Sequence, residues 1–347
     1  MSSITLPVAA IKASNLRPLN ILRDLPQVAD LIEICFQSTM DDEGQSYVQQ
    51  MRRASGDRDF LSWAARLVDS TSMPLAGFVW EEGGKIVGNV SLVYQTHHGQ
   101  RIAMIANVAT HPDYRRAGIG RALTQRAMES ARQKGAQGLW LQVRHDNQTA
   151  IRIYADLGFV ERARRTTYRS KDSTFNSAAS APSIASGPRS PSAVRSSRAG
   201  VATVVRRAEA RHWPSQYAWL QRTHPDEIGW YAHWNWKPMG PGLRNYVHRL
   251  FTDTEARHWS ALRNGRLLAT VTWIPNMRTS DALWLAAPQD ADGAGARLAL
   301  ETARQDLVQV RKLTVEHPAG ELEQAIQDAG FEASRTLIWM RAAATPA

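Results

Sequence analysis

The feature that most constrains this chain is a glycine loop between a short apolar run and a helical pattern. Residues 104–109 predict a strand, residues 115–120 read Arg-Arg-Ala-Gly-Ile-Gly, and residues 119–131 repeat apolar side chains at helical spacing. The first N–H groups of a helix have no partner inside it, and the helix dipole adds partial positive charge there. This order predicts an anion site, because glycines let the main chain close around a phosphate.

The loop carries three arginines, Arg115, Arg116 and Arg121, whose guanidinium groups form charge-assisted hydrogen bonds with anions. It lacks the Gly-Lys-Ser/Thr of a P-loop and the third glycine of the dinucleotide fingerprint. Taken alone, Gly118 and Gly120 are equally well explained as ordinary turn residues. The interpretation as an anion site therefore depends on the residues that follow.

A second strand and a short second helix follow the loop. Gly135 can end the first helix, and apolar residues alternate over residues 139–143 as in a strand. Asn147 is placed to cap a helix that carries Tyr154 and ends with Leu-Gly-Phe at residues 157–159. The glycine loop thus belongs to a longer pattern of alternating strands and helices.

This series resembles the GCN5-related N-acetyltransferase (GNAT) superfamily over roughly residues 15–168. The resemblance implies an α/β fold with a mixed, mostly antiparallel sheet flanked by helices, acetyl-CoA as the co-substrate, and no metal ion. In that family the arginine–glycine loop cradles the pyrophosphate, and the strand before it binds the pantetheine arm and polarises the thioester carbonyl. Coenzyme contacts are accordingly expected at Val108, Ala109, Thr110, Arg115, Arg116, Ala117, Gly118, Ile119, Gly120, Arg121 and Asn147.

The same resemblance makes Tyr154 the candidate general acid at the sulfur of the leaving group. It lies seven residues after Asn147, the spacing of ribosomal-protein amino-terminal acetyltransferases, and a phenol with an ordinary pKa near 10 can donate to a thiolate. The alternative is that Tyr154 only packs with Ala150, Ile151 and Leu157 on one helix face.

The general base is not evident from the sequence. Those ribosomal-protein enzymes carry a glutamate five residues before the asparagine, whereas this chain has Gln142, which cannot take a proton. The other candidates are Glu81, Glu82, His111 and His145, each of which is equally consistent with a surface or turn position. Water is the remaining acceptor for the proton of the amine.

The 347 residues favour two domains. We predict a flexible tail at residues 1–14, the acetyl-CoA-binding domain at 15–169, a linker rich in Ser, Ala, Pro and Gly at 170–200, and a second domain at 201–345.

The second domain repeats the pattern of the first. Residues 84–90 match residues 265–271, and residues 141–159 align with residues 313–331 without a gap. Such self-similarity predicts two tandem copies of one fold.

The second copy lacks the residues that the resemblance assigns to chemistry. Residues 290–295 read Asp-Ala-Asp-Gly-Ala-Gly, so carboxylates replace the arginines; Ala319 replaces the asparagine and Ile326 the tyrosine. We therefore expect a degenerate copy that completes a substrate cleft, and the alternative is that it binds a different ligand.

Within the first domain we expect an edge strand at residues 16–21, a helix at 24–36 capped by Asp24, a hairpin at 78–94, and a closing strand at 164–168.

Composition limits the remaining function classes. The net charge of +10 indicates an anionic partner, but scattered arginines without interleaved aromatics make nucleic acid the less favoured one. No apolar run reaches the roughly 20 residues of a membrane span, residues 1–12 do not resemble a signal peptide, and the single Cys35 excludes an intrachain disulfide, so we expect a cytoplasmic protein. The favoured function is acetyl transfer to a primary amine of a small molecule or protein, and the rival is a non-catalytic acyl-CoA sensor or scaffold; the acceptor and oligomeric state are left open.

Overall fold

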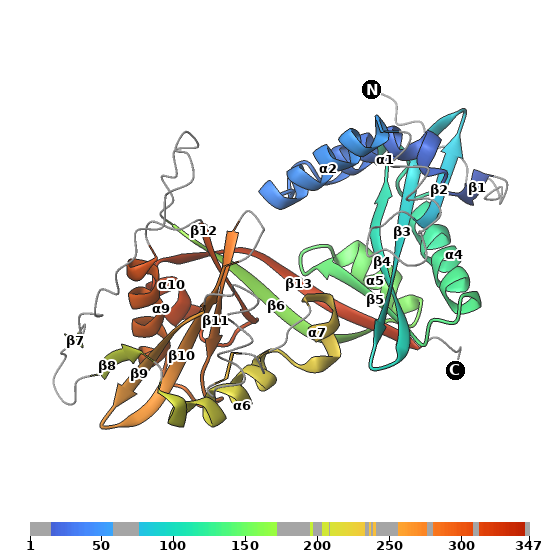
Figure 1. Cartoon of the computed structure of the whole chain (residues 1–347). Coiled ribbons are helices and arrows are strands. Elements are labelled where there is room, and N and C mark those ends of the chain that lie inside the picture. Colours follow the sequence, from blue (N-terminus) through green and yellow to red (C-terminus); the bar gives the residue numbers. More distant parts are fainter. Residues whose placement is uncertain are drawn as a thin grey trace. The chain divides into compact units, whose positions relative to one another are not determined.

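The computed structural model divides into two compact units, one formed by residues 1–163 and 338–347 and the other by residues 164–337 (Figure 1). The predicted tail and nearly all of the predicted linker lie outside the residues that the structure describes. Those residues are 15–57, 76–171, 195–196, 203–207, 209–232, 236, 239–240, 256–275, 280–307 and 312–343.

The first unit contains a mixed sheet in the order β1-β2-β3-β4-β5-β13. Strands β1 to β4 pair antiparallel, and β4 pairs parallel with β5 through Ile102↔Gly138 to Ile105↔Leu141. The predicted mixed, mostly antiparallel sheet is therefore confirmed. The strand bounds are β1 Leu16–Pro18, β2 Ala76–Glu82, β3 Lys85–His97, β4 Gln100–Thr110, β5 Gly138–Arg144 and β13 Phe331–Ala343.

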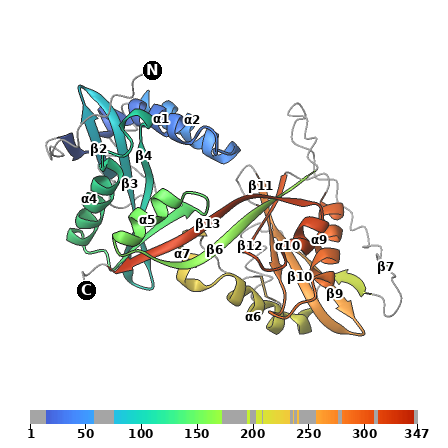
Figure 2. The same ribbon diagram turned by 180° about the vertical axis from the view of Figure 1, so that it is seen from behind.

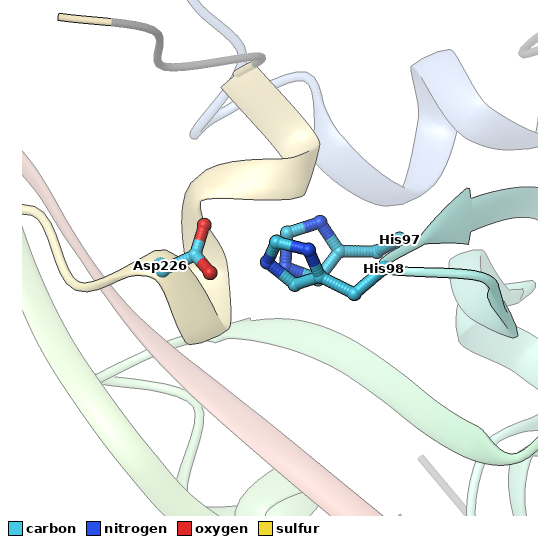
Figure 3. A group of neighbouring side chains, drawn as sticks. All are labelled: His97, His98 and Asp226. Atoms are coloured by element: carbon cyan, nitrogen blue, oxygen red, sulfur yellow. The ribbon is translucent and has the colours of Figure 1, made fainter. Parts of the chain in front are cut away.

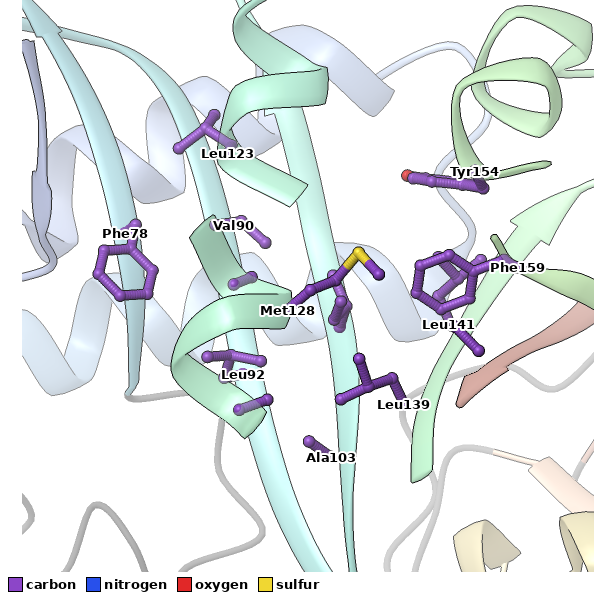
Figure 4. Packing of buried hydrophobic residues seen from close by; sticks show 14 of the residues in the cluster. Phe78, Val90, Leu92, Ala103, Leu123, Met128, Leu139, Leu141, Tyr154 and Phe159 are labelled. Carbon is purple, nitrogen blue, oxygen red and sulfur yellow. The ribbon is translucent and has the colours of Figure 1, made fainter. Parts of the chain in front are cut away.

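Hydrophobic clusters cover both faces of this sheet. On one face, Leu123 and Met128 of α4 pack with Val90, Leu92 and Leu139 of the strands (Figure 4). On the other face the core is built with α1 and α2. Because each strand alternates its side chains between the two clusters, the sheet holds both helical layers. The helices are α1 Ile21–Phe36, α2 Asp42–Ser55, α4 Ile119–Gln133 and α5 Gln148–Asp156.

The start of α1 differs from the prediction. The helix begins at Ile21, and the side chain of Asn20 caps it by accepting a hydrogen bond from the N–H of Leu22 at 3.1 Å. Asp24 is buried inside the first turn, where Arg17 donates to it at 2.6 Å. Residue type alone could not distinguish a capping carboxylate from one that is buried against an arginine.

The second unit repeats the sheet-and-helix arrangement of the first unit (Figure 2). Its strands follow the order β6-β12-β11-β10-β9-β8-β7, and the β11–β12 pair is parallel, as is β4–β5 in the first unit. Gly158 and Gly330, which the sequence repeat aligns, both have left-handed φ angles, of 87° and 88°. The strands are β6 Val160–Ser170, β7 Arg195–Ser196, β8 Thr203–Arg207, β9 Arg257–Arg263, β10 Arg266–Ile274, β11 Ser280–Ala286 and β12 Lys312–Pro318; the helices are α6 Trp213–Thr223, α7 Asp226–Ala232, α9 Ala294–Asp306 and α10 Glu323–Asp328.

The last strand of each predicted domain extends into the other compact unit. In the second unit, Tyr168 of β6 pairs with Val315 of β12, and Thr166 pairs with His317. In the first unit, the core includes Ile338, Met340 and Ala342 from the end of β13. The units therefore differ from the predicted domains 15–169 and 201–345, and residues 164–168 do not close the first one. Alternating side chains specify which faces of a strand are buried, but not which sheet edge it joins.

No helix among the described residues is both long and apolar enough to cross a membrane.

Candidate functional site

The turn between β4 and α4 has an irregular backbone. After the single turn of 3₁₀ helix Pro112–Tyr114, Arg116 and Gly118 have left-handed φ angles of 65° and 79°. Such a conformation is uncommon for arginine and is a form of local strain that is often found at functional sites. Gly118 is the N-cap of α4 and has no side chain, and no side chain among the described residues caps the first N–H groups of this helix.

Two glycines bring the start of α4 close to the sheet. A Cβ atom added to Gly88 of β3 would lie 2.8 Å from Cγ2 of Ile119 and 2.9 Å from Cδ1 of Leu123. A Cβ atom on Gly120 would lie 3.6 Å from Oγ1 of Thr110, at the end of β4. The end of β4 and the turn are therefore parts of one site.

The arginines of the turn are exposed on this site. Arg115 donates from Nε to the carbonyl of Thr110 at 3.4 Å, and Arg121 forms an ion pair with Asp156 of α5 at 3.2 Å. Exposed pairs of this kind contribute little stability, so an anionic ligand can compete for these side chains. The structure thus combines uncapped N–H groups with adjacent guanidinium groups.

Asn147 lies at the start of α5, as the sequence predicts. Its Oδ1 accepts a hydrogen bond from the N–H of Ala150 at 3.1 Å, which confirms the capping prediction. The side chain is exposed. Its expected hydrogen bond to a pantetheine arm stays a prediction.

Tyr154 is buried in the core of the first unit. Its ring lies edge-on to Phe159, with centroids 6.1 Å apart, and Figure 4 shows its hydroxyl directed toward the side of α4. Burial raises the pKa of the phenol to about 12, so it carries its proton at neutral pH. The packing of Tyr154 with Ala150, Ile151 and Leu157 is therefore confirmed, and its role as an acid stays a prediction.

The candidate bases are engaged elsewhere. Glu81 forms ion pairs with Arg17 and Arg23, and Glu82 accepts a hydrogen bond from Asn15. Glu81 is also two strands away from the end of β4, which is about 10 Å at normal strand spacing. His145 is an exposed turn residue.

His111 belongs to the turn itself. It caps the 3₁₀ helix, where its ring nitrogen accepts from the N–H of Asp113 at 3.4 Å, and its ring lies edge-on to Tyr114. Glu81, Glu82 and His111 are thus held in ion pairs or hydrogen bonds, and the expectation that a water molecule accepts the proton stays a prediction.

One polar group near the turn has no counterpart in the sequence predictions. Asn107 of β4 has a left-handed φ of 51° and donates from Nδ2 to the hydroxyl of Tyr47 at 2.8 Å. Buried Asn89 of β3 donates to the carbonyl of Asn107 at 3.0 Å. The signal in the sequence was the pair of asparagines inside two apolar strands, where this residue is uncommon.

The second unit has a turn whose glycine has the same conformation but whose neighbouring side chains differ. Gly293 is the N-cap of α9 with a φ of 78°, close to the value at Gly118. Asp292 accepts a hydrogen bond from the N–H of Ala294 at 3.1 Å and pairs with Arg263 at 2.9 Å. A cleft of about 690 Å³ at this turn contains three carboxylates, Asp292, Glu323 and Asp328.

His97 and His98 lie far from the glycine turn. Their rings, in the β3–β4 hairpin, are 4.1 Å apart, and Figure 3 also labels Asp226, which begins α7 in the second unit. The strand register places them at the opposite ends of β3 and β4 from Gly88 and Thr110. The histidines therefore do not contribute to the candidate site, and the expected absence of a metal ion stays a prediction.

Comparison with known families identifies the family of the segment that contains the glycine turn. Residues 32–159, which include β4, the glycine turn and α4, match the acetyltransferase (GNAT) family model. This segment of the first unit therefore belongs to the GNAT superfamily. The predicted family is thereby confirmed, while the residue roles and the degeneracy of the second GNAT copy stay predictions.

The curated relatives are similar over a short segment. The ribosomal protein bS18-alanine N-acetyltransferase of Escherichia coli (strain K12) is 42% identical over 66 residues, which is 19% of this chain and 45% of that enzyme. Streptothricin acetyltransferase of Streptomyces lavendulae is 37% identical over 76 residues, or 22% of this chain and 39% of that protein. The chain thus spans less than half the length of these two relatives.

A solved structure is similar in fold to both units. A GCN5-related N-acetyltransferase from Sphaerobacter thermophilus covers 96% of this chain and is itself covered to 96%, with a TM-score of 0.53 and 13% sequence identity. At this identity the likeness concerns the fold alone. It agrees with the two similar sheet-and-helix units described above.

Proposed function

We propose that the first unit transfers an acetyl group from acetyl-CoA to a primary amine of a small molecule or a protein. The observation that carries this proposal is the turn at the start of α4. Its uncapped N–H groups and exposed Arg115 and Arg116 form an anion site next to the end of β4. Both halves of the coenzyme, the pyrophosphate and the pantetheine arm, then have neighbouring partners.

Each part of the site has a separate task. The turn from Arg115 to Arg121 holds the pyrophosphate, and the main chain of Val108, Ala109 and Thr110 holds the pantetheine arm and polarises the thioester carbonyl. Asn147 adds a hydrogen bond to that arm. The small spacing between Gly120 and Thr110 supports the assignment, because one extended molecule can reach both segments.

The reaction then needs an attacking amine and a leaving thiolate. The amine nitrogen forms a bond to the carbonyl carbon, the carbon–sulfur bond breaks, and the proton lost by the amine passes to water. A phenol with a pKa of about 12 holds its proton more tightly than a thiol with a pKa near 8.5. Tyr154 therefore acts as a hydrogen-bond donor that stabilises the departing thiolate, and the thiolate then takes a proton from water to form the free thiol.

For the second unit we propose a structural role without pyrophosphate binding. Asp292 already accepts from the N–H of Ala294, and the carboxylates Glu323 and Asp328 lie in the same cleft. Negative charges at this turn repel a diphosphate. The arrangement supports the proposed degeneracy of this copy.

The second candidate is an acyl-CoA sensor that binds the coenzyme without transferring the acetyl group. It is favoured by Gln142 in place of a carboxylate and by the two ion pairs that engage Glu81. The two candidates share the coenzyme site and differ only in turnover.

A charge reversal tests the proposal. Arg116→Glu places a carboxylate beside the pyrophosphate, and losing one charge-assisted hydrogen bond lowers affinity for acetyl-CoA by roughly tenfold or more. Arg162→Glu, at an exposed position of β6, is the matched control and keeps the affinity for acetyl-CoA. Calorimetry measures binding, and release of free thiol with a panel of primary amines measures turnover.

The two measurements separate the candidates. Unchanged affinity in Arg116→Glu means that the phosphates bind elsewhere, which contradicts the site. Normal affinity with no thiol release across the panel supports the sensor.

A further inference from the structure

A β-bulge interrupts the pairing of β3 and β4 immediately before the coenzyme segment. Asn89 pairs with Ala109 and Ser91 pairs with Ala106, so one residue of β3 faces two residues of β4, Asn107 and Val108. Such a bulge bends the strand and redirects its backbone groups. The orientation of the N–H groups at Val108 and beyond therefore depends on the conformation of Asn107.

Three polar side chains hold this bulge. Asn107 donates from Nδ2 to the hydroxyl of Tyr47 at 2.8 Å and to Oγ of Ser91 at 3.3 Å. Asn89 donates to the carbonyl of Asn107 at 3.0 Å. Both the side chain and the main chain of Asn107 are thereby fixed, the side chain by α2 and the carbonyl by β3.

The polar side chains of Asn89 and Asn107 do more than fill space in the core. Asn89 is fully buried, and among the described residues its Oδ1 has no hydrogen-bond partner, which is unfavourable for stability. An apolar residue would avoid that penalty but would leave the carbonyl of Asn107 without its donor. Asparagine at position 107 likewise suits a left-handed φ that most side chains disfavour.

We propose that Tyr47 and Asn107 are positioning residues that set the β4 bulge, so that the main chain at Val108 donates to the thioester carbonyl. This inference rests on the proposed acetyl transfer in the first unit. It adds a link between α2 and the reacting carbonyl. Helix α2 then does more than cover the sheet. Its Tyr47 hydroxyl fixes the side chain of Asn107, and Asn107 in turn orients the main-chain N–H of Val108 that activates the acetyl group.

The link has a kinetic consequence. A hydrogen bond to the carbonyl oxygen strengthens as the amine attacks and negative charge develops on that oxygen. A displaced bulge therefore lowers the rate of acetyl transfer, while the pyrophosphate turn at Arg115 to Arg121 keeps most of the binding energy. The expected signature is a fall in kcat at nearly constant affinity for acetyl-CoA.

Infrared spectroscopy of the full chain with acetyl-CoA labelled with ¹³C at the thioester carbonyl tests this directly. Binding to the unaltered protein lowers the carbonyl stretching frequency relative to the free coenzyme. Tyr47→Phe removes only the hydroxyl, so it loses most of that shift and lowers kcat about fivefold to tenfold, with the dissociation constant changed less than about twofold. Tyr94→Phe, on β3 within the other hydrophobic cluster, is the matched control and keeps both values.

A second variant does not depend on the tyrosine. Asn107→Gly permits the left-handed φ and removes the side chain, so it reproduces the loss of Tyr47→Phe. The variant that combines Tyr47→Phe with Asn107→Gly is no slower than Asn107→Gly alone, because both substitutions remove the same hydrogen bond.

The outcomes separate this inference from the proposed function. A carbonyl shift that survives in both single variants, or that is absent from the unaltered protein although acetyl-CoA binds, overturns the positioning role. A protein that neither binds acetyl-CoA nor releases thiol overturns the proposed function, and the inference with it.

Discussion

The closeness of α4 to the sheet depends on the missing side chain of Gly88. An alanine there places its methyl group 2.8 Å from Cγ2 of Ile119, 2.9 Å from Cδ1 of Leu123 and 3.1 Å from Cβ of Trp80. Leu123 can change rotamer, but the β-branched Ile119 has one strongly preferred χ1 rotamer in a helix, and Cβ of Trp80 is fixed by the backbone. The start of α4, and with it the glycine turn, has to shift away from β3.

The size of the effect follows from these contacts. Normal carbon–carbon contact is about 3.5 Å or more, so the helix moves by several tenths of an ångström. Overpacking of this kind costs about 1–3 kcal/mol, and each kcal/mol lowers the Tm of a unit of this size by roughly 2–4 °C. Gly88→Ala should therefore lower both the Tm and the affinity for acetyl-CoA.

Gly138→Ala is the matched control in the same sheet. Its added methyl group would meet only ordinary contacts of 3.6 Å, with Arg341, Ile102 and Trp140. Replacing such a glycine restricts the unfolded chain, so stability should stay constant or rise by about 0.4–1 kcal/mol. Thermal unfolding and calorimetry with acetyl-CoA compare the two variants. If Gly88→Ala were as stable as Gly138→Ala and bound acetyl-CoA normally, the close approach of α4 would be refuted.

Two further predictions concern buried titratable groups. Tyr154→Phe should abolish most thiol release while the calorimetric affinity for acetyl-CoA stays within about twofold; normal turnover would exclude the donor role. Burial, with Arg165 and Arg222 nearby, lowers the pKa of His317 to about 3. Because the unfolded chain takes up that proton below pH 6.5, stability is full above this value and should fall by about 2 kcal/mol between pH 8 and pH 5. Urea unfolding at both pH values should show a smaller fall in His317→Gln; an equal fall would refute the assignment.

Much of the first unit could be predicted because its signals are local. The hairpin at residues 78–94, the cap at Asn147 and the glycine at the start of α4 depend on neighbouring residues and on backbone conformations that few side chains tolerate. The arginine–glycine turn, with the strand before it and the helix after it, also carried the family resemblance. These elements could be recognised without knowledge of long-range contacts.

The elements whose structure differs from the sequence prediction depend on partners that are distant in the chain. Asp24 is explained by Arg17, which reaches it from the preceding strand, and the ends of β6 and β13 are explained by the strands with which they pair. The bulge at Asn107 depends on Tyr47, which lies 60 residues earlier. In each case the sequence contains the polar residue or the strand, but not the identity of its partner.

The two glycine turns show which positions maintain the fold and which can determine ligand binding. Gly118 and Gly293 have φ angles of 79° and 78°, so both copies keep the residue that the strand-to-helix turn requires. The preceding residue differs: Ala117 provides no side-chain acceptor for the first N–H groups of α4, whereas the carboxylate of Asp292 accepts a hydrogen bond from the N–H of Ala294 in α9. A match in backbone between the units is therefore expected whether or not both bind acetyl-CoA. The side chain before the glycine is the feature that separates a turn able to receive a diphosphate from one already occupied by a negative charge.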